Sequence, residues 1–131
     1  MTNSAERNGG YTEPSILVVD DDPKLREVAM WALEDEGFAV QVAGGRREAA
    51  ERVKRRPPAL VVLDMGLPPD EGDSVAADVR AACGQVPILL ITADGKASQK
   101  ARRVGAFAYL HKPFDVERLV FLVRERLSAA S

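Results

Sequence analysis

The amino-acid sequence predicts an α/β fold with a parallel sheet that is covered by helices on both faces. Short apolar runs rich in valine, isoleucine and leucine alternate with longer stretches of helical spacing, and the alternation repeats five times. This alternation is typical of βαβ units. The apolar runs also lead into polar residues, at the edge where open α/β sheets bind ligands.

The expected elements follow one another along a single domain. We expect strands at residues 15–19, 39–43, 60–63, 87–91 and 108–110, and helices at residues 23–36, 46–56, 74–82, 96–104 and 116–129. Residues 1–14 are polar and show no periodicity, so we expect a flexible N-terminal arm ahead of a domain at residues 15–129.

Local signals support the first helix. Asp22 and Pro23 suit an N-cap and an N1 proline, because proline presets φ there and its missing N–H would be unpaired anyway. Gly37 is placed to end the helix in a left-handed conformation. We expect Trp31 and Met30 at the margin of the core rather than in a docking patch. The expected apolar face consists of Leu25, Val28, Ala29, Ala32 and Leu33.

Breakers and caps delimit the later helices. Pro57 and Pro58 stop the second helix, and Gly84 and Gly105 can end the third and fourth. Asp115 can cap the fifth helix. The apolar stripe of that helix is Val116, Leu119, Val120, Val123 and Leu127.

Composition excludes several classes of protein. A chain of 131 residues with 46% hydrophobic and 29% charged residues is typical of one globular domain. The net charge of -2 gives no bulk attraction to nucleic acid. A single cysteine, Cys83, excludes an internal disulfide and a multi-cysteine zinc site, and it suits a cytoplasmic setting. We find neither a membrane-spanning run nor a signal peptide.

Three aspartates end two of the expected strands. Asp20 and Asp21 follow the first apolar run, and Asp64 follows the third. These strands are often neighbours in doubly wound sheets, so the carboxylates can converge. Magnesium prefers oxygen ligands and reverses the cost of packing like charges. We expect Mg²⁺ to bind Asp21 and Asp64 directly, the Gly66 carbonyl as a third protein ligand, and Asp20 through water.

The same edge carries groups suited to phosphoryl transfer. Asp64 is the candidate nucleophile, which would become an aspartyl phosphate. Lys112, together with the metal, would neutralise charge on the phosphoryl oxygens, and Thr92 would hydrogen-bond one of them. Pro113 follows the lysine and allows a cis peptide bond there.

These motifs resemble the receiver domain of two-component response regulators, over residues 15 to about 127. Gly72 lies eight residues after Asp64, as the loop glycine of that family usually does. The matching stretches are residues 16–23 (ILVVDDDP), 63–68 (LDMGLP), 91–93 (ITA) and 105–114 (GAFAYLHKPF).

The resemblance implies a flavodoxin-like sheet of order 2-1-3-4-5. It implies that Asp64 accepts phosphate from a histidine kinase or a histidine phosphotransfer domain, using Mg²⁺. It implies a signalling switch that promotes only its own phosphorylation and dephosphorylation. Thr92 and Tyr109 match the switch pair of the family, which alters the face made by the fourth helix, fifth strand and fifth helix.

The resemblance also implies a downstream protein or output domain as partner, with no direct binding of nucleic acid or membrane. A homodimer would form through that switch face or through the first and fifth helices. The chain ends shortly after the expected fifth helix, and we expect a stand-alone regulator rather than a fragment.

The sequence departs from the family between Thr92 and Gly105. The spacing of thirteen residues is about two shorter than the family usually has, which places the usual dimer geometry in question. Asp94 and Gly66 occupy positions that flank the phosphate in the family, where either could tune its lifetime.

Two alternatives remain at this point. A haloacid-dehalogenase-like phosphohydrolase also uses an aspartyl nucleophile, magnesium, threonine and lysine. Its first motif needs Asp-x-Asp-x-Thr or Val, whereas residues 20–24 read Asp-Asp-Asp-Pro-Lys. A degenerate receiver would keep the fold and signal by protein contact without phosphorylation.

Overall fold

The computed structural model describes residues 14–66 and 71–130 of the chain. The expected N-terminal arm therefore lies outside the described residues, apart from Pro14. The elements in chain order are β1 (Ser15–Val19), α1 (Pro23–Asp35), β2 (Ala39–Ala43), α2 (Arg46–Arg55), β3 (Leu60–Asp64), α3 (Glu71–Cys83), β4 (Ile88–Thr92), α4 (Ala97–Val104), β5 (Ala108–His111) and α5 (Val116–Ala130).

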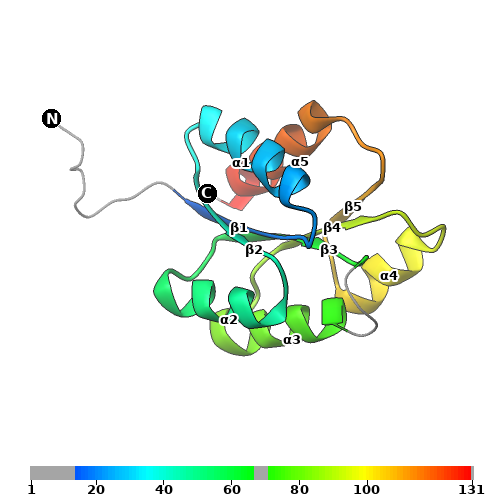
Figure 1. Ribbon diagram of the computed structural model, residues 1–131, viewed down its shortest axis with the longest axis horizontal. Helices are drawn as coiled ribbons and strands as arrows, with labels where there is room; N and C mark the ends of the chain where they lie inside the picture. The colour runs from blue at the N-terminus through cyan, green and yellow to red at the C-terminus, as the bar shows by residue number, and fades with distance from the viewer. Residues whose placement is uncertain (1–13, 67–70, 131) are drawn as a thin grey trace, which may run out of the picture.

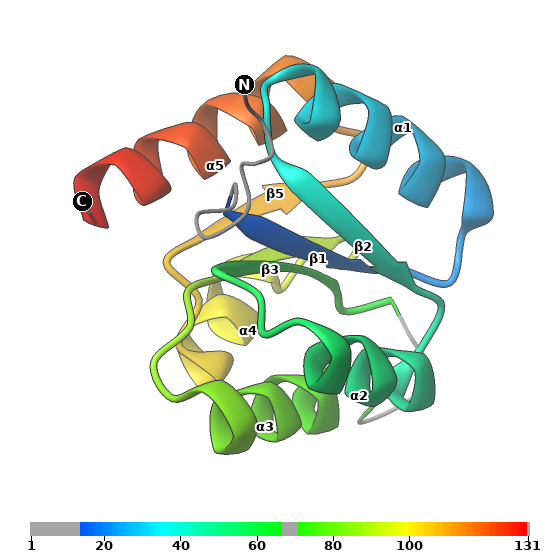
Figure 2. The ribbon, with the colours of Figure 1, turned by 90° about the vertical axis from the view of Figure 1, so that its left-hand side faces the viewer.

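The strands form one parallel sheet in the order β2-β1-β3-β4-β5, which confirms the expected topology. Helices α1 and α5 cover one face of the sheet, and α2, α3 and α4 cover the other (Figure 1). The same three layers are visible from the side (Figure 2). The described helices include none that is long and apolar enough to cross a bilayer.

The core consists of two layers because successive strand residues point to opposite faces. In β1, Leu17 and Val19 pack with the α2, α3 and α4 side, whereas Ile16 and Val18 pack with the α1 and α5 side. Strands β1, β3 and β4 are buried along their whole lengths. This burial explains why they are continuous apolar runs in the sequence.

The expected caps are confirmed. The Asp22 side chain accepts a hydrogen bond from the Lys24 backbone N–H at the start of α1. Asp115 accepts one from the Glu117 N–H in the first turn of α5. Gly37 has a φ of 95° just after α1, a backbone conformation that residues other than glycine rarely adopt.

One predicted helix boundary was wrong by more than one residue. Helix α3 begins at Glu71, not at residue 74. Gly72 therefore lies in the first turn of a helix rather than in a loop, and it is buried against Met65. Glu71 and Asp73 favour this earlier start, because acidic side chains stabilise the N-terminal turn of a helix.

The expected apolar face of α1 needs correction. Ala29 and Leu33 are buried as expected, but Val28 is 44% exposed. Trp31 is 60% exposed, so the expectation that it sits at the margin of the core was wrong. Helix α1 therefore presents two large apolar side chains to solvent.

Candidate functional site

Three carboxylates meet where β1 and β3 end. Pairing of Val19 with Leu63 brings the ends of these neighbouring strands level, so Asp20 and Asp64 lie side by side. Ligand atoms of Asp20, Asp21 and Asp64 all lie within 4.8 Å of one another. Asp20 and Asp64 are buried, whereas Asp21 is exposed. The expected convergence of the three acids is therefore present.

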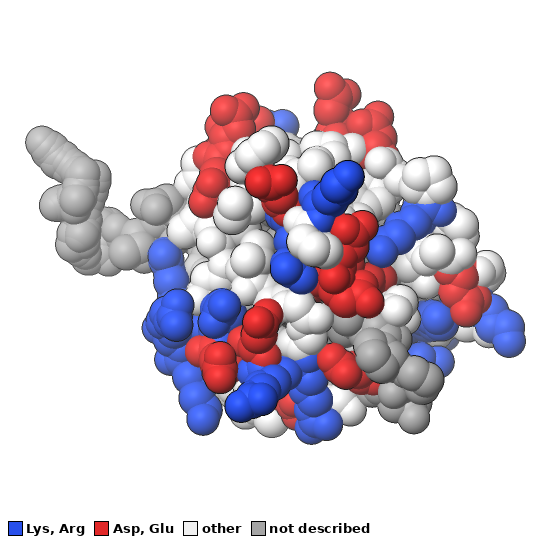
Figure 3. Space-filling view, in the orientation of Figure 1, with Lys and Arg blue, Asp and Glu red and all other residues white. Residues whose placement is uncertain are grey.

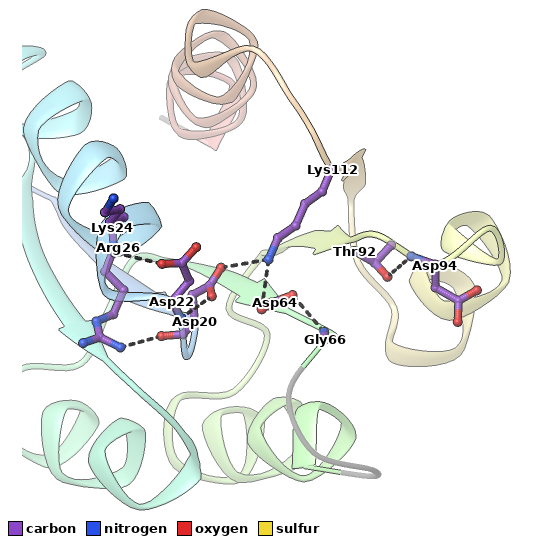
Figure 4. A network of polar contacts seen from close by, with 9 residues as sticks. All are labelled: Asp20, Asp22, Lys24, Arg26, Asp64, Gly66, Thr92, Asp94 and Lys112. Carbon is purple, nitrogen blue, oxygen red and sulfur yellow. Dashed lines mark hydrogen bonds and ion pairs between the residues drawn. The ribbon is translucent and has the colours of Figure 1, made fainter.

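Backbone groups orient the two buried carboxylates. The Asp22 N–H donates to Asp20 Oδ1 at 2.8 Å, and the Gly66 N–H donates to Asp64 Oδ1 at 2.8 Å (Figure 4). A Cβ atom on Gly66 would lie 3.1 Å from Asp64 Oδ1, so glycine leaves this oxygen uncrowded. These contacts hold the Asp20 and Asp64 carboxylates in place.

Lys112 reaches both buried acids from the end of β5. Its Nζ lies 3.2 Å from Asp64 Oδ2 and 3.4 Å from Asp20 Oδ2. Burial alone would lower the pKa of Lys112, but attraction from Asp64 and Asp20 outweighs burial and raises it. The ammonium therefore stays charged at neutral pH. The Lys112–Pro113 peptide bond is cis, as the sequence allowed.

Asp20 is held in an environment that disfavours its charge. Burial, together with repulsion from Asp64, raises the pKa of Asp20 to about 6 despite the hydrogen bond from Asp22. Asp20 Oδ2 has no hydrogen-bond partner among the described residues. This buried oxygen has the Lys112 ammonium at 3.4 Å but no hydrogen bond, and it lies beside two further carboxylates. Such a site fits a hard divalent cation with oxygen ligands.

Thr92 lies at the end of β4, next to the acids, and is buried. Its Oγ1 accepts a hydrogen bond of 3.0 Å from the Asp94 N–H. Tyr109, in contrast, is 45% exposed on β5. Thr92 is therefore buried at the end of the strand beside Asp64, and the Tyr109 ring is partly exposed.

Arg26 was missed by the sequence patterns. Its Nη1 donates to the Asp20 carbonyl oxygen at 2.8 Å and so ties α1 to the end of β1. The signal that could have found it is its position in the first turns of the helix that follows Asp20. Lys100, which pairs with Asp94 at 3.2 Å, was also missed.

An apolar groove opens beside the site. It has a volume of about 600 Å³ and lies between the start of α1 and the loop that joins β5 to α5. Its lining residues are Asp22, Lys24, Leu25, Val28, Ala93, Lys112, Pro113, Phe114 and Val116. Basic side chains gather elsewhere, over α2 at the lower left of the molecule (Figure 3).

Comparison with protein families gives a match to the response regulator receiver domain over residues 16–124. The chain belongs to this family. A DNA-binding response regulator, MtrA of Mycolicibacterium smegmatis, is 42% identical over 114 residues, which is 86% of this chain and 50% of that protein. The transcriptional regulatory protein PmrA of Pectobacterium parmentieri is 38% identical over 111 residues, 83% of this chain and 50% of that protein.

Solved structures of receivers have the same fold. The chemotaxis protein CheY4 of Vibrio cholerae superposes with a TM-score of 0.78 at 27% identity, over 87% of this chain and 98% of that one. The receiver domain of a putative LuxO repressor protein from Vibrio parahaemolyticus gives 0.79 at 26% identity, over 90% and 92% of the two chains.

The chain is thus a phosphoacceptor receiver domain of two-component signalling. Neither the phosphohydrolase nor the degenerate receiver is favoured by these comparisons. The receiver spans about half the length of the curated relatives that it matches.

Proposed function

We propose that Asp64 is the phosphoacceptor of this receiver. The observation that carries the proposal is the ion pair between Lys112 Nζ and Asp64 Oδ2, at 3.2 Å, inside a cluster of three acids. A carboxylate oxygen of Asp64 attacks the phosphorus of a phosphohistidine. The phosphorus–nitrogen bond breaks, its electron pair returns to the imidazole, and Asp64 carries an acyl phosphate.

Mg²⁺ would be held by Asp20, Asp21, Asp64 and the Gly66 carbonyl. When bound, the ion neutralises charge on the phosphoryl oxygens. The Asp20 Oδ2 oxygen supports this ligand set, because it is buried and makes no hydrogen bond among the described residues, apart from its ion pair with Lys112.

Lys112 and Thr92 complete the site. Lys112 Nζ lies close to the carboxylates of Asp20 and Asp64. After phosphorylation it can pair with a phosphoryl oxygen in place of Asp64 and keep its ion pair with Asp20. The Thr92 hydroxyl donates a hydrogen bond to another phosphoryl oxygen. Movement of Thr92 makes room for Tyr109 to turn inward, which changes the surface formed by α4, β5 and α5.

The phosphodonor approaches through the groove beside Lys112. Its apolar lining suits a helix of a histidine kinase or histidine phosphotransfer domain, and the exposed Val28 and Trp31 extend the apolar surface along α1.

A downstream protein or an output domain binds the surface that the switch changes. We further propose that this receiver domain is cytoplasmic, that it promotes only its own phosphorylation and dephosphorylation, and that it makes no direct contact with nucleic acid. A homodimer would use α4-β5-α5 or α1-α5.

Intact mass tests the proposal. The protein is incubated with Mg²⁺ and acetyl phosphate, alongside Asp64→Ala and the control Asp35→Ala, an exposed acid at the end of α1. We expect one phosphoryl addition in the parent and in the control, none in Asp64→Ala, and none when Mg²⁺ is chelated. A folded parent that gains no phosphoryl group would contradict the proposal.

A further inference from the structure

A chain of three contacts runs from the buried Thr92 to the surface of α4. The Asp94 N–H donates to Thr92 Oγ1 at 3.0 Å. Asp94 Oδ1 then accepts the Lys96 N–H at 2.8 Å, and Asp94 Oδ2 lies 3.2 Å from Lys100 Nζ. The Lys100 side chain is only 19% exposed, so its ammonium is held close to the protein surface rather than in open solvent.

The direction of these contacts determines what the Thr92 hydroxyl can do. A hydroxyl has one proton and two lone pairs. Because the Asp94 N–H occupies a lone pair, the proton of Thr92 stays available for an acceptor. The Asp94 carboxylate points away from Asp64 and Lys112 (Figure 4), so its charge does not compete for that proton.

We propose that Lys100 is a positioning residue for phosphorylation: by holding the Asp94 carboxylate on α4, it keeps the Asp94 N–H on Thr92 and the Thr92 proton turned toward the phosphoryl site. The inference rests on the proposed function of Asp64 and Thr92, and it adds a residue on a different element.

The local charges support this role for Lys100. Hydrogen bonds from Lys96 and Lys100 lower the pKa of Asp94, so the pair is ionic at neutral pH. Lys96 contributes its backbone N–H and can do so whatever its side chain is. The Lys100 N–H also donates to the Lys96 carbonyl oxygen at 3.0 Å, whatever the side chain at position 100 is. The Lys100 ammonium ties the Asp94 carboxylate to α4 through a side chain that can be changed without altering the backbone.

Substitution of Lys100 tests the inference. The rate of Asp64 phosphorylation by acetyl phosphate with saturating Mg²⁺ is followed by intact mass. Lys100→Met keeps the length of the side chain but removes its charge, and we expect it to slow the reaction about three- to tenfold, a part of the roughly ten- to hundredfold that a hydrogen bond to a charged group is worth. Lys100→Arg keeps the charge and should restore most of the rate.

A double-mutant cycle separates positioning from a general structural effect. In a Thr92→Val background, which has no hydroxyl to position, Lys100→Met should have no further effect. The matched control is Arg103→Met, which removes another ion pair of α4, with Asp73, away from the site. It should leave the rate unchanged.

The outcomes of this experiment are distinct. If the parent protein is not phosphorylated, both the proposed function and this inference are contradicted. A parent that is phosphorylated at the same rate as Lys100→Met overturns the inference alone. The inference is also overturned if Lys100→Met slows the Thr92→Val protein as much as it slows the parent, or if Arg103→Met is as slow as Lys100→Met.

Discussion

Asp20 is a buried carboxylate whose surroundings disfavour its charged form. It is fully buried, lies beside Asp64, and has a pKa near 6, so the folded protein disfavours its charged form. The pKa of Asp20 in the folded state is above its ordinary value of 3.8. Ionisation of Asp20 therefore lowers the stability of the fold as the pH rises from 3.8 to about 6, and the full penalty is present above about pH 6.

Asp20→Asn should therefore stabilise the protein when no divalent ion is present. At pH 7.5 with chelator we expect a gain of about 1–3 kcal/mol in the free energy of unfolding, measured by urea denaturation, and little gain at pH 4. Asp21→Asn is the control, because its exposed carboxylate has little desolvation to relieve. An Asp20→Asn protein that is less stable than the parent at pH 7.5 would contradict this account of the site.

Gly72 is required by packing rather than by backbone conformation. A Cβ at this position would lie 2.5 Å from Met65 Sδ, beside the site loop. Gly72→Ala should lower the free energy of unfolding by about 1–3 kcal/mol, because the partly buried Met65 thioether must move. Gly95→Ala is the control, since a Cβ there meets nothing within 4 Å. Equal stability of the two variants in thermal denaturation would count against this view of Gly72.

At the scale of elements, α4 is held by α3 at its C-terminal end. Arg80 donates to the carbonyl oxygens of Val104 and Gly105, which end α4 and would otherwise lack helical partners. Arg103 of α4 pairs with Asp73 of α3 through two hydrogen bonds. Helix α4 has only eight residues, so side chains of a neighbouring helix supply much of its anchorage.

Arg80→Met should loosen α4 without unfolding the domain. We expect amide hydrogens of α4 to exchange about tenfold faster or more, as the loss of about 1–2 kcal/mol of local stability would give, while β1 and β3 keep their protection. Hydrogen exchange read by mass spectrometry measures this. Arg124→Met, which breaks a pair with Glu36 between α5 and α1, should leave α4 unchanged. Exchange that rises equally across the sheet would show a global effect instead.

At the scale of the whole molecule, metal binding and folding are coupled through the acidic cluster. A ligand that binds only the folded state stabilises it by about 1–3 kcal/mol at concentrations of 10 to 100 times its Kd. The cluster assembles only when β1 and β3 pair, so the unfolded chain offers no comparable site.

Mg²⁺ should therefore raise the melting temperature of the protein at pH 7.5 and raise it less at pH 5. The pKa of Asp20 near 6 means that its carboxyl is largely protonated at pH 5, and ion binding must then displace that proton. Differential scanning calorimetry at matched ionic strength measures both shifts. The shift should vanish in Asp64→Asn. A larger shift at pH 5 than at pH 7.5 would contradict the assignment of the ion to this cluster.

Sequence patterns were sufficient for the elements because each carries its own local signal. The continuous apolar runs at β1, β3 and β4 reflect burial on both faces, and Asp22, Gly37 and Asp115 mark helix ends through contacts with their own neighbours. The start of α3 escaped prediction because Gly72 is a weak helix former. Its place there depends on Met65, a contact that spacing alone does not reveal.

The candidate site divides in the same way. The sequence by itself determined which residues gather at the sheet edge, because polar residues at the ends of parallel strands must share that edge whatever surrounds them. Only the tertiary structure decided the electrostatics: the burial of Asp20, the reach of Lys112 to two acids, and the tie from Thr92 through Asp94 to Lys100. These depend on side-chain distances between separate elements, which no local pattern encodes.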